Sequence, residues 1–167
     1  MITNVKLLSM TRFHKQLMFS FLAALNQMIE QFSDVILIDN QSLENYISNS
    51  KSYISNPSGP YEFKNGILIL SPYSSIEFTV DLNSEVGYVP TKVLVAISPE
   101  KENNNIRYGA KFPSDADITE TNELNYVILT NTNSESSITI LIENNSEYDA
   151  HILSIGIMTK QVKNEKW

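Results

Sequence analysis

The chain has 167 residues, of which 42% are hydrophobic and 19% charged, so it is long enough and apolar enough to bury a core of its own. It contains no cysteine, which excludes disulfides, thiolate metal sites and cysteine nucleophiles. Its formal net charge is −7, and nearly all of the acidic residues follow residue 33, which disfavours nucleic acid as a partner.

An amphipathic helix is predicted for residues 4–32. Apolar side chains recur there at steps of three and four residues, a period typical of a helix with one broad apolar face. The apolar block 17–25 follows basic residues and has the shape of a signal peptide, but the helical spacing continues past its end. Because the block is also about half as long as a membrane span requires, we expect a helix and no membrane span.

The apolar face of this helix is the candidate surface for oligomerisation or attachment. A face so wide must be covered, either by the remainder of the same chain or by copies of the helix in other chains. The sequence leaves these two alternatives open. The principal row of the face consists of Phe13, Leu17, Phe21, Leu25, Met28 and Phe32, and a second row holds Met18, Leu22 and Ile29.

The segment after this helix leads to the predicted domain boundary. The apolar run 35–38 indicates a strand or a buried continuation of the preceding segment, and a short second helix is expected for residues 41–53. The sequence Asn-Pro-Ser-Gly-Pro at 56–60 is the strongest turn signal in the chain. We therefore predict an N-terminal helical assembly region at 1–56, a β-sandwich domain at 57–160 and a polar tail at 161–167.

After the predicted boundary the hydrophobic period changes from 3.6 residues to 2. Short apolar segments alternate with turn-forming residues, and no long helical pattern separates them, which disfavours a parallel sheet. The predicted fold is mainly β with an N-terminal helix, the β part being an antiparallel sandwich of jelly-roll or Greek-key type. The expected strands are 67–70, 76–82, 93–97, 106–112, 126–129, 138–142 and 151–158.

Sequence motifs for catalysis are absent: the chain has no G-x-S-x-G, no H-E-x-x-H and no glycine-rich phosphate loop. His151 could act as a base with Asp149 or Glu147, but no nucleophile stands beside it, so a hydrogen-bonded strand-edge residue is expected. His14, on the helix, is expected to be solvated or to cap rather than to form a histidine ring at a symmetry axis. We expect no enzyme activity, no metal and no cofactor.

An acidic loop and several tyrosines are the candidates for recognition. The loop around Asp115 and Asp117 does not match a calcium-binding EF-hand and is expected to be solvated, and a mobile loop would hold two catalytic carboxylates poorly. Tyrosines near turns could stack on sugar rings or could serve only as strand-edge residues. The candidate recognition surface comprises Tyr108, Tyr126, Asp115 and Asp117.

Four segments between residues 75 and 158 carry a family resemblance: Ile76–Val80, Val89–Val95, Ser137–Ser146 and His151–Met158. Together they resemble the small sandwich modules of tailed-bacteriophage virion proteins, including lectin-like modules, and a helix before a sandwich is similar to trimeric phage fibres. The resemblance implies a non-enzymatic structural protein of the virion, a fibre, decoration or adaptor that forms a homotrimer and contacts other virion proteins. The alternative that it implies is a module that binds a host surface glycan.

Overall fold

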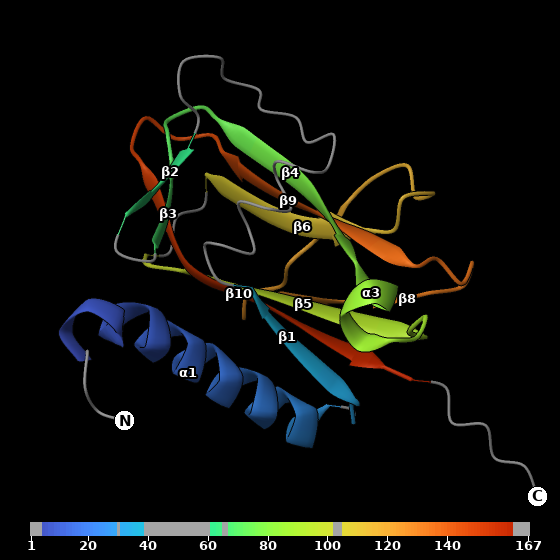
Figure 1. Ribbon diagram of the computed structural model, residues 1–167. Helices are drawn as coiled ribbons and strands as arrows, with labels where there is room; N and C mark the ends of the chain where they lie inside the picture. The colour runs from blue at the N-terminus through green and yellow to red at the C-terminus, as the bar shows by residue number, and fades with distance from the viewer. Residues whose placement is uncertain (1–4, 30, 39–60, 65–66, 102–104, 162–167) are drawn as a thin grey trace, which may run out of the picture.

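The computed structural model describes residues 5–29, 31–38, 61–64, 67–101 and 105–161, with the side chains of the first helix described from Lys15 onward. Helix α1 is followed by strands of an all-antiparallel β-domain and by one short helix, α3 (Figure 1). The elements are α1 (Val5–Met28), β1 (Asp34–Ile38), β2 (Tyr61–Lys64), β3 (Ile67–Leu70), β4 (Ser75–Asp81), α3 (Leu82–Val86), β5 (Lys92–Pro99), β6 (Ile106–Lys111), β7 (Thr119–Glu120), β8 (Tyr126–Thr130), β9 (Ser137–Asn144) and β10 (Ala150–Lys160).

Two antiparallel sheets pack against each other, which confirms the predicted β-sandwich with an N-terminal helix (Figure 1). The larger sheet has the order β2-β3-β10-β5-β8, with β1 also paired to β10, and the smaller sheet has the order β4-β9-β6-β7. Each of the seven strands expected after residue 57 is present. Strands β2 and β7 were not predicted, because each is short and partly exposed and therefore leaves a weak alternation pattern.

Strand β1 confirms the apolar run 35–38 as a strand, and it belongs to the sandwich. It pairs with β10 from Asp34 opposite Thr159 to Ile38 opposite Ile155. The sandwich therefore includes residues that precede the boundary expected after residue 56. The helix expected at 41–53 and the turn at 56–60 lie outside the described residues.

The core between the sheets is built from alternating side chains, as the period of 2 predicted. In β4 the inward residues Ile76, Phe78 and Val80 are almost completely buried, whereas the residues between them are half-buried. They meet the inward residues of β9, namely Ile138, Ile140 and Ile142, in register. The outer face of the smaller sheet is correspondingly polar, and Thr79 and Thr139 lie side by side on it with their hydroxyl oxygens 3.2 Å apart.

Strand β10 departs from simple alternation, because a bulge between Ile152 and Ser154 shifts its register against β5. Before the bulge the even-numbered Ile152 faces the core, and after it the odd-numbered Ile155 and Ile157 do so. The intervening outward positions, Gly156 and Met158, are then free to face helix α1. One extra residue thus lets a single long strand contribute to the core along its whole length.

Asn144, at the end of β9, holds together the turn that leads into β10. Its side chain is fully buried, and its Nδ2 donates to the carbonyl oxygens of Leu70, Ser71 and Tyr148 at 2.8–3.1 Å. Its Oδ1 accepts from the backbone N–H of Ser146 at 3.0 Å and from the Ser146 hydroxyl at 2.7 Å. One amide group therefore satisfies backbone carbonyls on two turns that would otherwise be buried without partners.

Replacing Asn144 should be much more costly than replacing its neighbour. We expect Asn144→Ala to lower the free energy of unfolding by about 2–4 kcal/mol, because it leaves several buried polar groups unpaired. The matched control is Asn145→Ala, since Asn145 is exposed and its side chain donates only to Glu143, at 2.7 Å. The control should cost less than about 1 kcal/mol. Urea unfolding followed by circular dichroism measures both, and equal losses would contradict this role for Asn144.

Candidate functional site

Helix α1 lies across the outer face of the larger sheet, over β1, β10 and β5 (Figure 1). Met18, Leu22 and Leu25 are buried there, each less than 5% exposed. They form a second apolar cluster with Leu94 and Ala96 of β5 and Met158 of β10. The sequence left open whether the apolar face is covered by the same chain or by other chains. This row of the helix is covered by the sandwich of its own chain.

Gly156 explains how closely the helix approaches the sheet. A Cβ atom at this position would lie 2.8 Å from Leu22 Cδ1 and 2.8 Å from Met18 Cγ, closer than carbon atoms pack. The absence of a side chain at residue 156 therefore provides the space that the helix occupies. Beyond the helix, the side-chain oxygen of Asn26 accepts from the backbone N–H of Phe32, and Phe32 is buried in the same cluster.

Part of the predicted assembly face of the helix is buried against the sandwich, and part of it is exposed. Leu25 and Phe32 are buried against the sandwich, Phe21 is half-buried, and Leu17 and Met28 are 51% and 79% exposed. The side chain of Phe13 lies outside the described part of the helix. Apolar residues beside the buried row share one flank of α1, here called the outer stripe: Leu17, Ala24 and Met28, which are exposed, and Phe21, which is half-buried.

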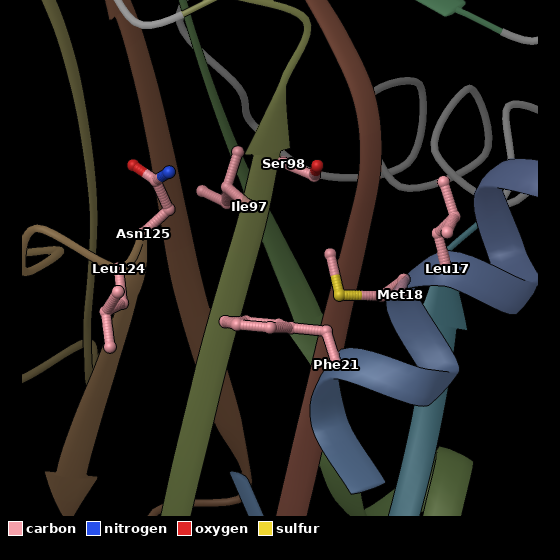
Figure 2. Close-up of a pocket in the computed structure, with 7 residues that line it drawn as sticks. All are labelled: Leu17, Met18, Phe21, Ile97, Ser98, Leu124 and Asn125. Carbon is pink, nitrogen blue, oxygen red and sulfur yellow. The ribbon is translucent and has the colours of Figure 1, made fainter. Parts of the chain in front are cut away.

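An apolar groove of about 200 Å³ adjoins the outer stripe (Figure 2). Phe21 projects from α1 over β5, and Leu124, which is 55% exposed, lies on the far side of β5. The outer stripe is therefore not an isolated row of apolar side chains, because it continues through this groove onto the loop before β8. The groove is lined by Leu17, Met18, Phe21, Ile97, Ser98, Leu124 and Asn125.

The four residues of the predicted recognition surface are not brought together as a surface. Tyr108 is only 6% exposed because its position in β6, opposite Ile142, points into the core, which corrects the expectation that it belongs to an accessible recognition surface. Tyr126 is half-buried against the cluster beneath α1. Asp115 and Asp117 are exposed, and Asp115 Oδ2 accepts from the backbone N–H of Phe112 at 3.2 Å, so this carboxylate closes a turn.

His151 is a hydrogen-bonded strand residue, as expected, but its partner is neither of the acids that the sequence suggested. Its Nδ1 lies 2.7 Å from Oε2 of Glu100, which follows β5. The two side chains belong to a second groove, of about 360 Å³, at the end of β5 and the start of β10. This groove, here called the His151 groove, is lined by Glu100, Lys101, Ile106, Tyr148, Asp149, Ala150 and His151.

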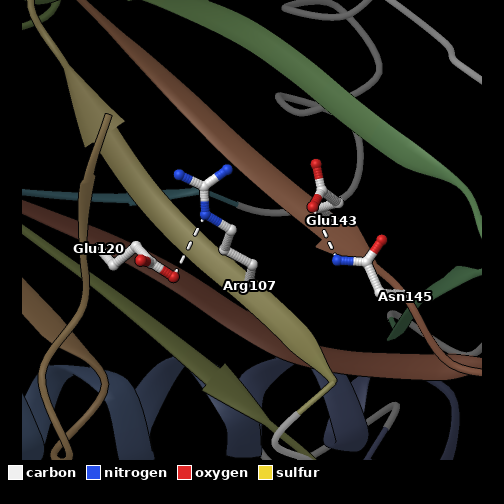
Figure 3. A network of polar contacts seen from close by, with 4 residues as sticks. All are labelled: Arg107, Glu120, Glu143 and Asn145. Carbon is white, nitrogen blue, oxygen red and sulfur yellow. Dashed lines mark hydrogen bonds and ion pairs between the residues drawn. The ribbon is translucent and has the colours of Figure 1, made fainter. Parts of the chain in front are cut away.

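The outer face of the smaller sheet carries exposed polar contacts (Figure 3). Arg107 Nε lies 3.2 Å from Glu120 Oε1, and Asn145 donates to Glu143. The two side chains of the ion pair are 40% and 60% exposed, so solvent screens them and the pair adds little stability.

Among the described residues, no group of three or more His, Asp or Glu side chains is placed to hold a metal ion. No helix in the described part of the chain is long and apolar enough to cross a membrane.

Tyr88 links β1 to β10 at the edge of the larger sheet. Its hydroxyl donates to Oδ2 of Asp34 at 2.5 Å and lies 2.6 Å from Oγ1 of Thr159. Burial raises the pKa of Tyr88 above its ordinary value, and the hydrogen bond to Asp34 and the negative charge of Asp34 raise it further. The neutral phenol is therefore the form that holds β1 against β10.

This raised pKa predicts a loss of stability at alkaline pH. Above about pH 10 a tyrosine in the unfolded chain releases its proton while Tyr88 in the folded chain retains it, so stability falls as pH rises through the folded pKa. We expect Tyr88→Phe to be about 1 kcal/mol less stable at neutral pH and to lose less stability than the wild type between roughly pH 9 and pH 11. Urea unfolding across this range measures the difference. If the free energy of unfolding fell equally with pH in the two proteins over this range, the raised pKa of Tyr88 would be contradicted.

No protein-family model matches the chain, and no curated protein matches it. Two of the solved structures that are similar to this chain share 12% sequence identity with it. One is a family two carbohydrate esterase from Cellvibrio japonicus, with a TM-score of 0.41 over 77% of this chain and 34% of that protein. The other is a family GH115 4-O-methyl-α-glucuronidase with specificity for decorated arabinogalactans, with a TM-score of 0.36 over 68% of this chain and 16% of that protein. The chain thus spans about a third or less of the length of these enzymes.

Proposed function

We propose that the protein is a non-enzymatic structural protein that self-associates through the outer stripe of α1. The observation that carries this proposal is that α1 has apolar residues both on the side that faces the sheet and on the flank beside it. One row of apolar side chains is buried on the sandwich. In the outer stripe beside it, Phe21 is half-buried against the same cluster and the other three residues remain exposed. A helix that only covered its own domain would be expected to present polar residues on the sides away from the sheet.

The spacing of the outer stripe supports another helix as its partner. Its residues, at positions 17, 21, 24 and 28, are separated by four, three and four residues. This is the spacing of the a and d positions of a heptad, which align on one side of a helix and pack into the corresponding side of a second helix. The stripe covers about 16 Å of helix length, roughly three turns.

The charge distribution favours further copies of this chain over a charged partner. Residues 16–29 contain no charged side chain, although the whole chain has a net charge of −7. Copies of α1 can therefore approach each other without like-charge repulsion along the contact, and a basic or acidic partner would find no complementary charge there.

Three copies joined through α1 would form a short helical stem with three sandwiches around it. This arrangement would suit a fibre, decoration or adaptor protein of a bacteriophage particle, the class that segments 76–80, 89–95, 137–146 and 151–158 resemble. In such a protein, apolar burial sets the assembly, and the loops and grooves of the sandwich remain available for other contacts.

The test is the solution mass of the full chain and of two matched variants, measured by light scattering after size exclusion. We expect the wild type to have the mass of three chains of 18.9 kDa each. Met28→Glu should reduce the mass to that of one chain, because it places charges in the stripe and Met28 is 79% exposed in the single chain. Phe19→Glu should leave the mass unchanged, because Phe19 is 54% exposed but lies on the other side of the helix, outside the stripe.

The variants also separate assembly from folding. Both substitutions affect exposed positions, so the circular dichroism spectrum and the unfolding midpoint of the single chain should change little. A monomeric wild type, or an equal effect of Met28→Glu and Phe19→Glu on the mass, would refute self-association through the stripe. A stable dimer that is abolished by Met28→Glu would keep the interface and refute the trimer.

A further inference from the structure

We propose that the His151 groove binds a neutral saccharide unit. The groove lies at the end of β5 and the start of β10, and it shares no lining residue with the groove beside the outer stripe. Its volume of about 360 Å³ falls within the range of roughly 300–1,000 Å³ that is usual for small-ligand sites. Binding at this place would add recognition to a protein whose α1 serves assembly.

An exposed aromatic side chain forms part of the groove wall. Tyr148 is 68% exposed, so its ring is accessible to a ligand in the groove. A tyrosine ring offers an apolar face with a hydroxyl at its edge, and the face can pack against the C–H groups of a pyranose ring. The ring thus supplies the flat surface that a sugar requires.

The turn that carries Tyr148 is rigid even though its side chain is exposed. The carbonyl oxygen of Tyr148 accepts from Asn144 Nδ2 at 2.8 Å and lies 3.0 Å from the hydroxyl oxygen of Ser146. The neighbouring Asn145 donates its backbone N–H to the carbonyl of Asn105 at 2.8 Å, which ties the turn to the segment before β6. A ring held on such a turn loses little backbone entropy when a ligand binds.

Residues with hydrogen-bond acceptors and residues with hydrogen-bond donors both line the His151 groove. Glu100 and Asp149 offer carboxylate oxygens as acceptors, and Lys101 offers an ammonium group as a donor. Because His151 Nδ1 is paired with Glu100, the ring is held in place and Nε2, at its other side, can serve a ligand. A sugar hydroxyl both donates and accepts, so a mixed set of this kind matches a row of hydroxyls.

The same set disfavours other ligand classes. Two carboxylates outnumber the one ammonium group, so the charge of the groove disfavours a phosphate, a sulfate or a uronic acid. Among the residues that the structure describes, no group of three or more His, Asp or Glu side chains is placed to hold a metal ion. An apolar ligand would leave the charged groups of the groove without solvent or partners. A neutral polyhydroxyl ligand with one apolar face is the class that satisfies the aromatic wall and the polar groups together.

The experiment is a titration of the ¹⁵N-labelled full chain, followed by amide chemical shifts. The probes are neutral oligosaccharides of glucose, galactose, mannose and N-acetylglucosamine, with a glucuronic-acid oligosaccharide as the acidic comparison. We expect at least one neutral probe to shift the amides of Glu100 and of residues 148–151 in a saturable manner. The acidic probe should bind more weakly.

Matched variants localise the binding. Tyr148→Ala should weaken binding about tenfold, since it removes the ring but keeps the backbone carbonyl that anchors the turn. Glu100→Gln, which preserves the shape of the side chain, should also weaken it and guards against a folding defect in the first variant. Tyr73→Ala should leave binding unchanged, because Tyr73 is 65% exposed but does not line the groove.

Four outcomes would overturn the proposal. These are no saturable shift with any neutral probe, shifts confined to residues away from the groove, unchanged binding by Tyr148→Ala, and equal or tighter binding of the acidic probe. None of them bears on self-association, because no residue of the outer stripe lines this groove. The solution mass therefore tests the assembly proposal separately.

Discussion

The architecture depends on burial of β10 on both of its faces. Its inner face, through Ile155 and Ile157, closes the core of the sandwich, and its outer face, through Gly156 and Met158, lies beneath α1. The same strand pairs with β5 along one edge and with β3 and then β1 along the other. Because so many contacts converge on one strand, the helix and both ends of the larger sheet are fixed relative to one another.

This constraint determines how much of α1 remains available to a partner. A helix that lies on a sheet can bury only the side chains on the facing side, here the row of Met18, Leu22 and Leu25. The apolar residues at Leu17 and Met28 lie on the flank and remain exposed, so the chain retains a surface that burial within one molecule does not satisfy.

Recognition and assembly would use different parts of the same framework. The outer stripe is apolar and uncharged, which suits association by burial, whereas the His151 groove combines one aromatic ring with carboxylates, an imidazole and an ammonium group. Asn144 connects that groove to the fold, because the amide that joins two buried turns also fixes the backbone of Tyr148. A binding surface on a rigid turn is consistent with a structural protein that presents a ligand site without moving.

The sequence by itself determined the mainly-β class, the seven principal strands and the N-terminal helix, because period and turn residues are local properties. It also contained an unused signal: apolar residues at both parities in 93–97 are typical of a strand covered on both faces. Only the tertiary structure decided which side of α1 is buried, that β1 joins the sandwich and that Glu100 is the partner of His151. These depend on a bulge and on pairings between distant segments, which no local pattern encodes.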